Sequence, residues 1–320
     1  MKKVSMERQR NTMTQQTFSV TARRPRVVIQ HVDGNLNVRS WERPEISVES
    51  AEPVVGMRQE GDTLTITDYR GDLSLWIPAI KGGLFSFATG VFTNLLVSHL
   101  SRSATIEGAG NVDLREIGGQ VTLERIHGNV DLENVHELAD ISGVGGNLHA
   151  TSVPTLRLKR GVGGNATLAS LQVAELDSIG GNLHVDRIER VLHVRNVGGN
   201  AHVRDCVGAE VSVNAVGGNL HIDGAALATS CSAGGNLDVW GSIPIDSQVR
   251  LRAGGNATVG LPADANVSVH AMAGGNITSP TVSRRGGGSL NLVYGNGQAR
   301  LDVAVGGNVR LQGDALPRAL

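Results

Sequence analysis

The chain of 320 residues contains 42 glycines but only four phenylalanines, three tryptophans and two tyrosines, so aliphatic side chains must fill its core. With nine prolines, 40% hydrophobic residues and a formal net charge of −1, the composition excludes collagen and argues against a disordered chain. The balanced charge also gives no electrostatic basis for specific nucleic-acid binding.

Residues 1–17 are polar and basic, and we interpret them as a disordered basic tail. They lack the run of roughly 7–15 apolar residues that a secretory signal peptide requires. As written, the sequence therefore predicts a cytoplasmic location, and a place on the cell surface would need another export route.

Alternating apolar and polar residues begin near Phe18 and predict one continuous β domain over residues 18–312, followed by a tail at 313–320. An apolar insertion at 81–103 interrupts this pattern. It contains Phe85, Phe87 and Phe92 but also Gly90 and polar residues, and it falls short of the roughly 20 apolar residues of a spanning helix. We expect it to cap the end of the core or to form an oligomer contact.

A Gly-Asn or Gly-Gly-Asn group recurs along the rest of the chain, mostly every 17–20 residues, which indicates stacked repeats. Its asparagines are Asn111, Asn129, Asn147, Asn165, Asn182, Asn200, Asn219, Asn236, Asn256, Asn276 and Asn308. The 32-residue gap before the last of them predicts a loop at 280–290 and an irregular terminal coil.

Each repeat divides into two similar halves of nine residues. Apolar residues stand one, three and six positions after the corner asparagine, as in Val112, Leu114 and Ile117, and the same spacing follows Gln120. Alternation at the first two positions is typical of a short strand with one buried face. The sequence therefore predicts an all-β, single-domain β-solenoid (β-helix), with coils of about 18 residues stacked about 4.8 Å apart.

The corner residues have a structural interpretation. Glycine permits a positive φ or a close approach between backbones, and asparagine can hydrogen-bond along the stack as a ladder. We therefore assign the asparagines to the corners and not to a ligand. Cys206 and Cys231 are too few for a disulfide framework and are predicted to be buried.

Few residues are candidates for chemistry. His184, His202 and His221 occupy equivalent outward positions of successive coils and are the candidate metal ligands, although a straight row converges poorly on one ion. A solvated strand face is the alternative interpretation. No hydrolase, zinc-protease or nucleotide-binding motif is present, so we predict a non-catalytic protein without a cofactor.

At the HVDGNLNV opening, the DLSLWIPA strand and the serial GNVDL, GGNLHV and GGNATL corners, the sequence resembles the bacterial "putative adhesin" β-solenoid family of unknown function. The resemblance spans roughly residues 18–312. It implies a non-enzymatic surface or scaffold role with a protein or surface-glycan partner.

Three functions stay open at this point. The first is a non-catalytic scaffold or adhesin-like interaction protein. The second is a polymer-forming cytoskeletal protein resembling bactofilins, which would associate through its solenoid ends. The third is a carbohydrate-active or metal-binding solenoid.

Overall fold

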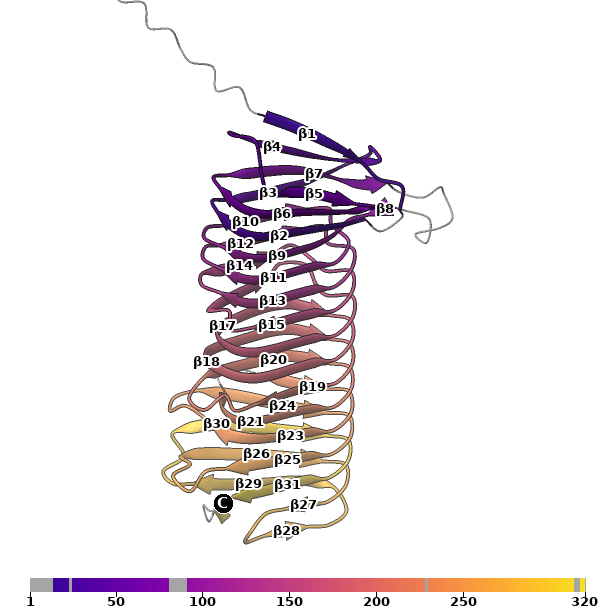
Figure 1. Cartoon of the computed structure of the whole chain (residues 1–320). Coiled ribbons are helices and arrows are strands. Elements are labelled where there is room, and N and C mark those ends of the chain that lie inside the picture. Colours follow the sequence, from indigo (N-terminus) through magenta and orange to yellow (C-terminus); the bar gives the residue numbers. More distant parts are fainter. Residues whose placement is uncertain (1–13, 23–24, 81–90, 228–229, 314–316, 320) are drawn as a thin grey trace, which may run out of the picture.

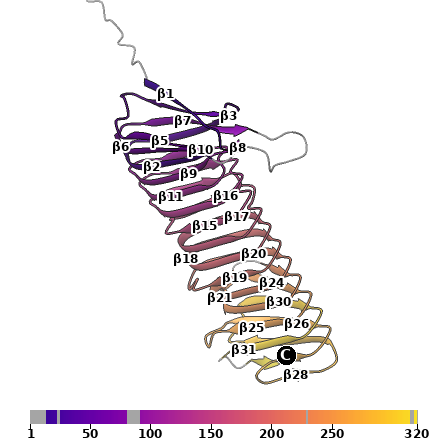
Figure 2. The same cartoon turned by 45° about the vertical axis from the view of Figure 1, so that its right-hand side comes forward.

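The structure is a computed structural model, and it describes residues 14–22, 25–80, 91–227, 230–313 and 317–319. These residues form an all-β single domain whose strands belong almost entirely to one continuous sheet, and they contain no helix. Figure 1 shows the strands stacked along one axis with the bends aligned along an edge, and Figure 2 shows the same stack from another side.

The N-terminal third supplies the first strands. They are β1 (Thr14–Ser19), β2 (Arg26–Asp33), β3 (Leu36–Trp41), β4 (Glu45–Ser50), β5 (Met57–Glu60), β6 (Thr63–Arg70), β7 (Leu73–Ile80), β8 (Val91–Phe92), β9 (Asn94–Leu100) and β10 (Ala104–Glu107).

The central coils follow in regular succession. Their strands are β11 (Val112–Ile117), β12 (Val121–Glu124), β13 (Val130–Val135), β14 (Leu138–Ile141), β15 (Leu148–Thr151), β16 (Thr155–Leu158), β17 (Ala166–Ile179), β18 (Leu183–Val197), β19 (Ala201–Arg204), β20 (Glu210–Val216), β21 (Leu220–Leu227), β22 (Cys231–Ala233), β23 (Leu237–Ser242), β24 (Gln248–Ala253) and β25 (Ala257–Leu261).

The C-terminal part completes the stack. Its strands are β26 (Val267–Ala273), β27 (Ile277–Thr278), β28 (Ser283–Arg284), β29 (Gly288–Tyr294), β30 (Ala299–Val305), β31 (Val309–Gly313) and β32 (Arg318–Ala319).

Parallel pairing between successive turns of the chain builds the central stack. Val112 pairs with Val130, Val130 with Leu148, and Leu148 with Ala166, so equivalent repeat positions lie side by side. We call the strands that directly follow the corner asparagines side A, and those that follow the second corner, nine residues on, side B. The first and third positions of these strands point inward and form the aliphatic core.

The coils at both ends are not stacked in chain order. At the C-terminal end, β30 lies between β24 and β26, and β31 lies between β25 and β27. At the N-terminal end, β2 lies between β6 and β9. At each end, two coils have therefore exchanged places relative to their order in the sequence. The coil with β26 is outermost at the C-terminal end and the coil with β6 at the N-terminal end, although β30 and β2 lie nearer to the respective chain ends.

Antiparallel strands cover both ends of the stack. β4 pairs with β7, and β1 pairs with β4 at one end, while β29 pairs with β26 and β32 with β29 at the other. Figure 1 shows β1 and β28 at opposite extremes of the molecule. These additions occupy hydrogen-bonding edges that parallel coils would otherwise leave open.

Three predicted boundaries need correction. Residues 14–17 of the predicted tail belong to β1, which pairs with β4, whereas residues 1–13 lie outside the described residues. The predicted loop at 280–290 includes β28 and the start of β29, which pair antiparallel with the outer coil. Within the predicted tail at 313–320, β32 extends the same edge.

The predicted insertion at 81–103 is wrong for its C-terminal half. β9 lies between β2 and β11 as a regular side A strand, because Leu95, Val97 and Leu100 follow Asn94 at the repeat spacing of one, three and six. Residues 81–90, with Phe85 and Phe87, and the side chain of Phe92 lie outside the described residues.

Candidate functional site

The corner asparagines form a continuous hydrogen-bonded ladder along side A. The backbone N–H of each asparagine donates to the side-chain Oδ1 of its neighbour on the previous coil, at 2.8–2.9 Å. In spatial order the ladder runs through Asn94, Asn111, Asn129, Asn147, Asn165, Asn182, Asn200, Asn219, Asn236, Asn256, Asn308 and Asn276.

Two members of the ladder differ from the prediction. Asn94 begins it and was missed because no glycine precedes it, although the apolar spacing after it was a usable signal. Asn308 lies between Asn256 and Asn276 because its coil is inserted there. Several side-chain Nδ2 groups also donate to the Oδ1 of the neighbouring asparagine, at 3.0–3.3 Å. A row of aspartates would lack these donors and would bring like charges together.

The glycines before each asparagine are required by close approach and not by positive φ. A Cβ on Gly199 would lie 2.5 Å from Asn182 Oδ1 and 2.9 Å from the carbonyl oxygen of Gly181, while the φ of Gly199 is ordinary. The left-handed conformation occurs five residues after the corner, where Asn134 and Ser152 have φ values of 55° and 56°. The corner glycines and asparagines thus have a structural role, because they allow successive coils to stack closely and join them by hydrogen bonds.

The candidate histidines form a stacked row on the outside of side A. The ring centroids of His184 and His202 are 5.3 Å apart and those of His202 and His221 are 4.6 Å apart, with interplanar angles of 17° and 20°. Parallel rings do not direct their nitrogens at one point. Within the described ranges no group of three His, Cys, Asp or Glu residues is arranged to hold a metal ion.

An acidic residue and a tryptophan extend the histidine row. His221 Nδ1 lies 3.1 Å from Asp238 Oδ2, and the indole Nε1 of Trp240 donates to Asp238 Oδ1 at 3.0 Å. Trp240 is 37% exposed, whereas Trp41 and Trp76 pack against each other near the N-terminal end. Sequence reasoning missed Trp240, whose outward position on its strand was the available signal.

Protonation of His202, the middle member of the row, is linked to stability. Partial burial, reinforced by the neighbouring His221 and His184, lowers the pKa of His202 from its ordinary value of 6.5. The unfolded chain then binds this proton more readily than the folded protein, so stability decreases as the pH falls through 6.5.

We expect the wild-type protein to lose more thermal stability between pH 7.5 and pH 5.5 than a His202→Gln variant. The glutamine keeps a polar side chain at this position but cannot take up a proton. Thermal unfolding followed by circular dichroism at several pH values measures the difference. Parallel stability profiles for the two proteins would contradict this linkage.

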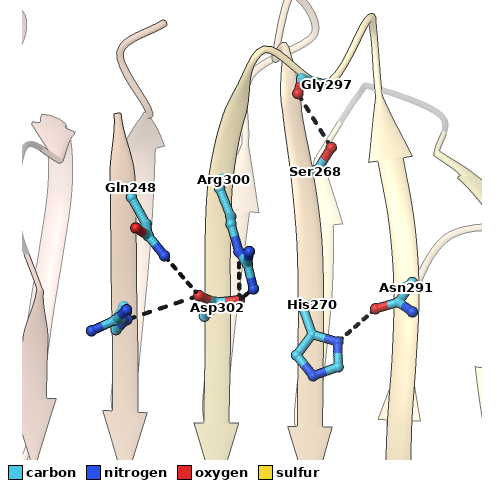
Figure 3. Close-up of polar contacts among 8 residues, drawn as sticks. Gln248, Ser268, His270, Asn291, Gly297, Arg300 and Asp302 are labelled. Carbon is cyan, nitrogen blue, oxygen red and sulfur yellow. Dashed lines mark hydrogen bonds and ion pairs between the residues drawn. The ribbon is translucent and has the colours of Figure 1, made fainter. Parts of the chain in front are cut away.

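A polar groove of about 680 Å³ lies on side B near the C-terminal end, where the inserted coil meets its neighbours. Two of its lining residues bond the adjacent Asp302: Arg300 Nε donates to it at 3.2 Å and Gln248 Nε2 at 3.5 Å (Figure 3). Arg250 Nε lies 3.9 Å from the same carboxylate. These residues come from β24 and β30, which are distant in sequence.

The neighbouring strands β26 and β29 of the same sheet also bring polar groups to this groove. His270 Nδ1 and Asn291 Oδ1 are 2.5 Å apart, and the hydroxyl of Ser268 donates to the carbonyl of Gly297 at 3.2 Å (Figure 3). Asp302 forms ion pairs with both Arg300 and Arg250, so one carboxylate faces two guanidinium groups. The groove is therefore a polar surface built from adjacent strands.

The two cysteines are free and buried, as the sequence predicts. Burial raises the pKa of both the Cys206 and the Cys231 thiol, which keeps them in the unreactive protonated form. No helix that could span a membrane occurs in the part of the chain that the structure describes.

Comparison with known proteins gives no family. No family model matches the chain, and no curated protein matches it either. Among solved structures, one described as a "putative cell adhesion protein" from Clostridium sporogenes is 13% identical, with 94% of this chain and 100% of that chain covered and a TM-score of 0.18.

A second solved structure, described as a "putative adhesin" from Bacteroides fragilis, is 9% identical, with 94% and 97% of the two chains covered and a TM-score of 0.21. At these TM-scores neither likeness carries weight for the function of this chain.

Proposed function

We propose that the chain is a β-solenoid that acts as a non-catalytic, adhesin-like interaction scaffold. The observation that supports this most directly is the unchanged register of the coils: Val112, Val130, Leu148 and Ala166 succeed one another in parallel pairs. Such a stack holds outward side chains in columns, and successive side chains within a column lie about 4.8 Å apart. Binding energy would then come from many weak contacts to a pre-ordered surface.

The structure of the C-terminal end disfavours stacking into filaments. β28 and β32 are two residues long, β28 carries Arg284, and both run antiparallel to their neighbours. Short, charged edge strands disfavour pairing with another chain. Stacking of one molecule on another, as the bactofilin-like alternative requires, would have to displace these strands.

Electron microscopy of the purified chain over a wide concentration range tests this proposal. We expect short rods of uniform length, and light scattering should give a mass that does not grow with concentration. A variant that begins at residue 25 lacks β1 and exposes the edge of β4 that faces away from β7, so it should associate through that end. Filaments of the intact chain would overturn the scaffold proposal in favour of the polymer.

A further inference from the structure

Trp240 is held in an unusual position for a large apolar side chain. Its indole lies over Gly260 on the neighbouring strand β25, where Cε3, Cδ2 and Cζ3 of the ring occupy the space that a Cβ would need. Gly260 is in a strand, away from the corner, and its φ is ordinary. Since glycine weakens a strand, its presence here is explained by the space that the ring takes up.

The ring is also fixed in orientation. The hydrogen bond from Trp240 Nε1 to Asp238 Oδ1 holds the edge of the indole, and His221 contacts the other oxygen of the same carboxylate. One face of the ring rests on the sheet, and the side chain stays 37% exposed. A pre-oriented aromatic surface has little conformational entropy left to lose on binding.

A groove of about 410 Å³ borders this ring, a volume in the range of roughly 300–1,000 Å³ that is usual for small-molecule sites. Glycine supplies five of its lining residues, and Val207, which is 82% exposed, also lines it. The glycines in the lining are Gly208, Gly224, Gly241, Gly260 and Gly313. Asp223, which pairs in register with Trp240, brings a carboxylate to the rim.

We propose that Trp240 and this groove form a binding subsite for a neutral sugar ring. The C–H groups on one face of a pyranose carry partial positive charge and suit the negative face of an indole, while its hydroxyls donate to carboxylates such as Asp223. Two nearby carboxylates, Asp223 and Asp238, disfavour an acidic sugar. The small lining residues leave room for the ring to lie flat.

This subsite rests on the proposed scaffold function and specifies its ligand class. Isothermal titration of the full chain with cellohexaose, maltohexaose and chitohexaose tests it. We expect at least one of these to bind, and Trp240→Ala to weaken that binding by about tenfold or more. Met272→Ala, which removes a 45% exposed side chain on side B, is the matched control and should leave the affinity unchanged.

Asp223→Ala provides a second variant that leaves the packing of Trp240 on Gly260 intact, and it should also weaken binding. Absence of binding to all three sugars, equal affinity of wild type and Trp240→Ala, or binding of choline in place of the sugars would each overturn the subsite. Because the particle measurements do not depend on sugar, uniform rods without sugar binding would overturn the subsite alone, whereas filaments would overturn the scaffold.

Discussion

Replacing Gly198 by alanine is expected to lower the free energy of unfolding by about 3 kcal/mol, at the upper end of the cost of overpacking. The new methyl group would overlap the carbonyl oxygen of Gly180 on the adjacent coil and lie 3.2 Å from its carbonyl carbon. Both atoms belong to backbone that is held in place by the hydrogen bond from the Gly198 N–H to Ile179 O. Chemical denaturation measures the loss.

Gly143→Ala is the matched control for this substitution. A Cβ at Gly143 would meet its nearest atom, the carbonyl oxygen of Gly161, at an ordinary 3.5 Å, and its φ is not in the left-handed region. Alanine there should be neutral or stabilise by up to about 1 kcal/mol, because it restricts the unfolded chain. Equal costs at the two glycines would show that close approach is not what selects glycine at the corners.

Ending the chain at residue 298 is expected to unfold residues 262–298 in addition to removing β30, β31 and β32. β30 and β31 lie between the coil of β24 and β25 and the coil of β26 and β27. Their buried Leu301, Val303, Val309 and Leu311 would each be lost, at about 1.5 kcal/mol or more. The outer coil would then have no inner neighbour to pack on.

Limited proteolysis with mass spectrometry measures this effect. Residues 262–298 should be digested in the shortened protein and protected in the full chain. A chain ending at residue 261 is the control, because it removes the whole exchanged pair of coils and should stay protected up to its new end. Protection of residues 262–298 in the first variant would mean that coils stack in chain order.

Much of this structure can be predicted from single repeats of the sequence. The spacing of Val112, Leu114 and Ile117 gives both the strand and its buried face, because side chains alternate along a strand wherever it lies. The glycine and asparagine corners follow from the same local pattern. Even the missed strand β9 obeys it after Asn94.

The candidate sites were less accessible to sequence reasoning. The histidine row was predicted from its periodicity, since equivalent positions of successive coils must be neighbours. The polar groove lined by Gln248, His270, Asn291 and Arg300 was not, because it combines β24, β26, β29 and β30 across an insertion. The position of the Trp240 ring depends on the residue paired with it on the neighbouring strand. That residue is Gly260, and only the register between β23 and β25 pairs the two.

The sequence by itself determined the coil: its length, its inward residues, its corners and the ladder that joins one coil to the next. Only the tertiary structure decided the order of the coils at both ends. The physical reason is that every coil offers the same contacts. The N–H of Asn308 donates to Asn256 Oδ1 and the N–H of Asn276 donates to Asn308 Oδ1 in the same way, so the ladder residues do not distinguish the two coils. What does distinguish the outer coil is its cover of antiparallel strands, because β29 pairs with β26 and β32 pairs with β29.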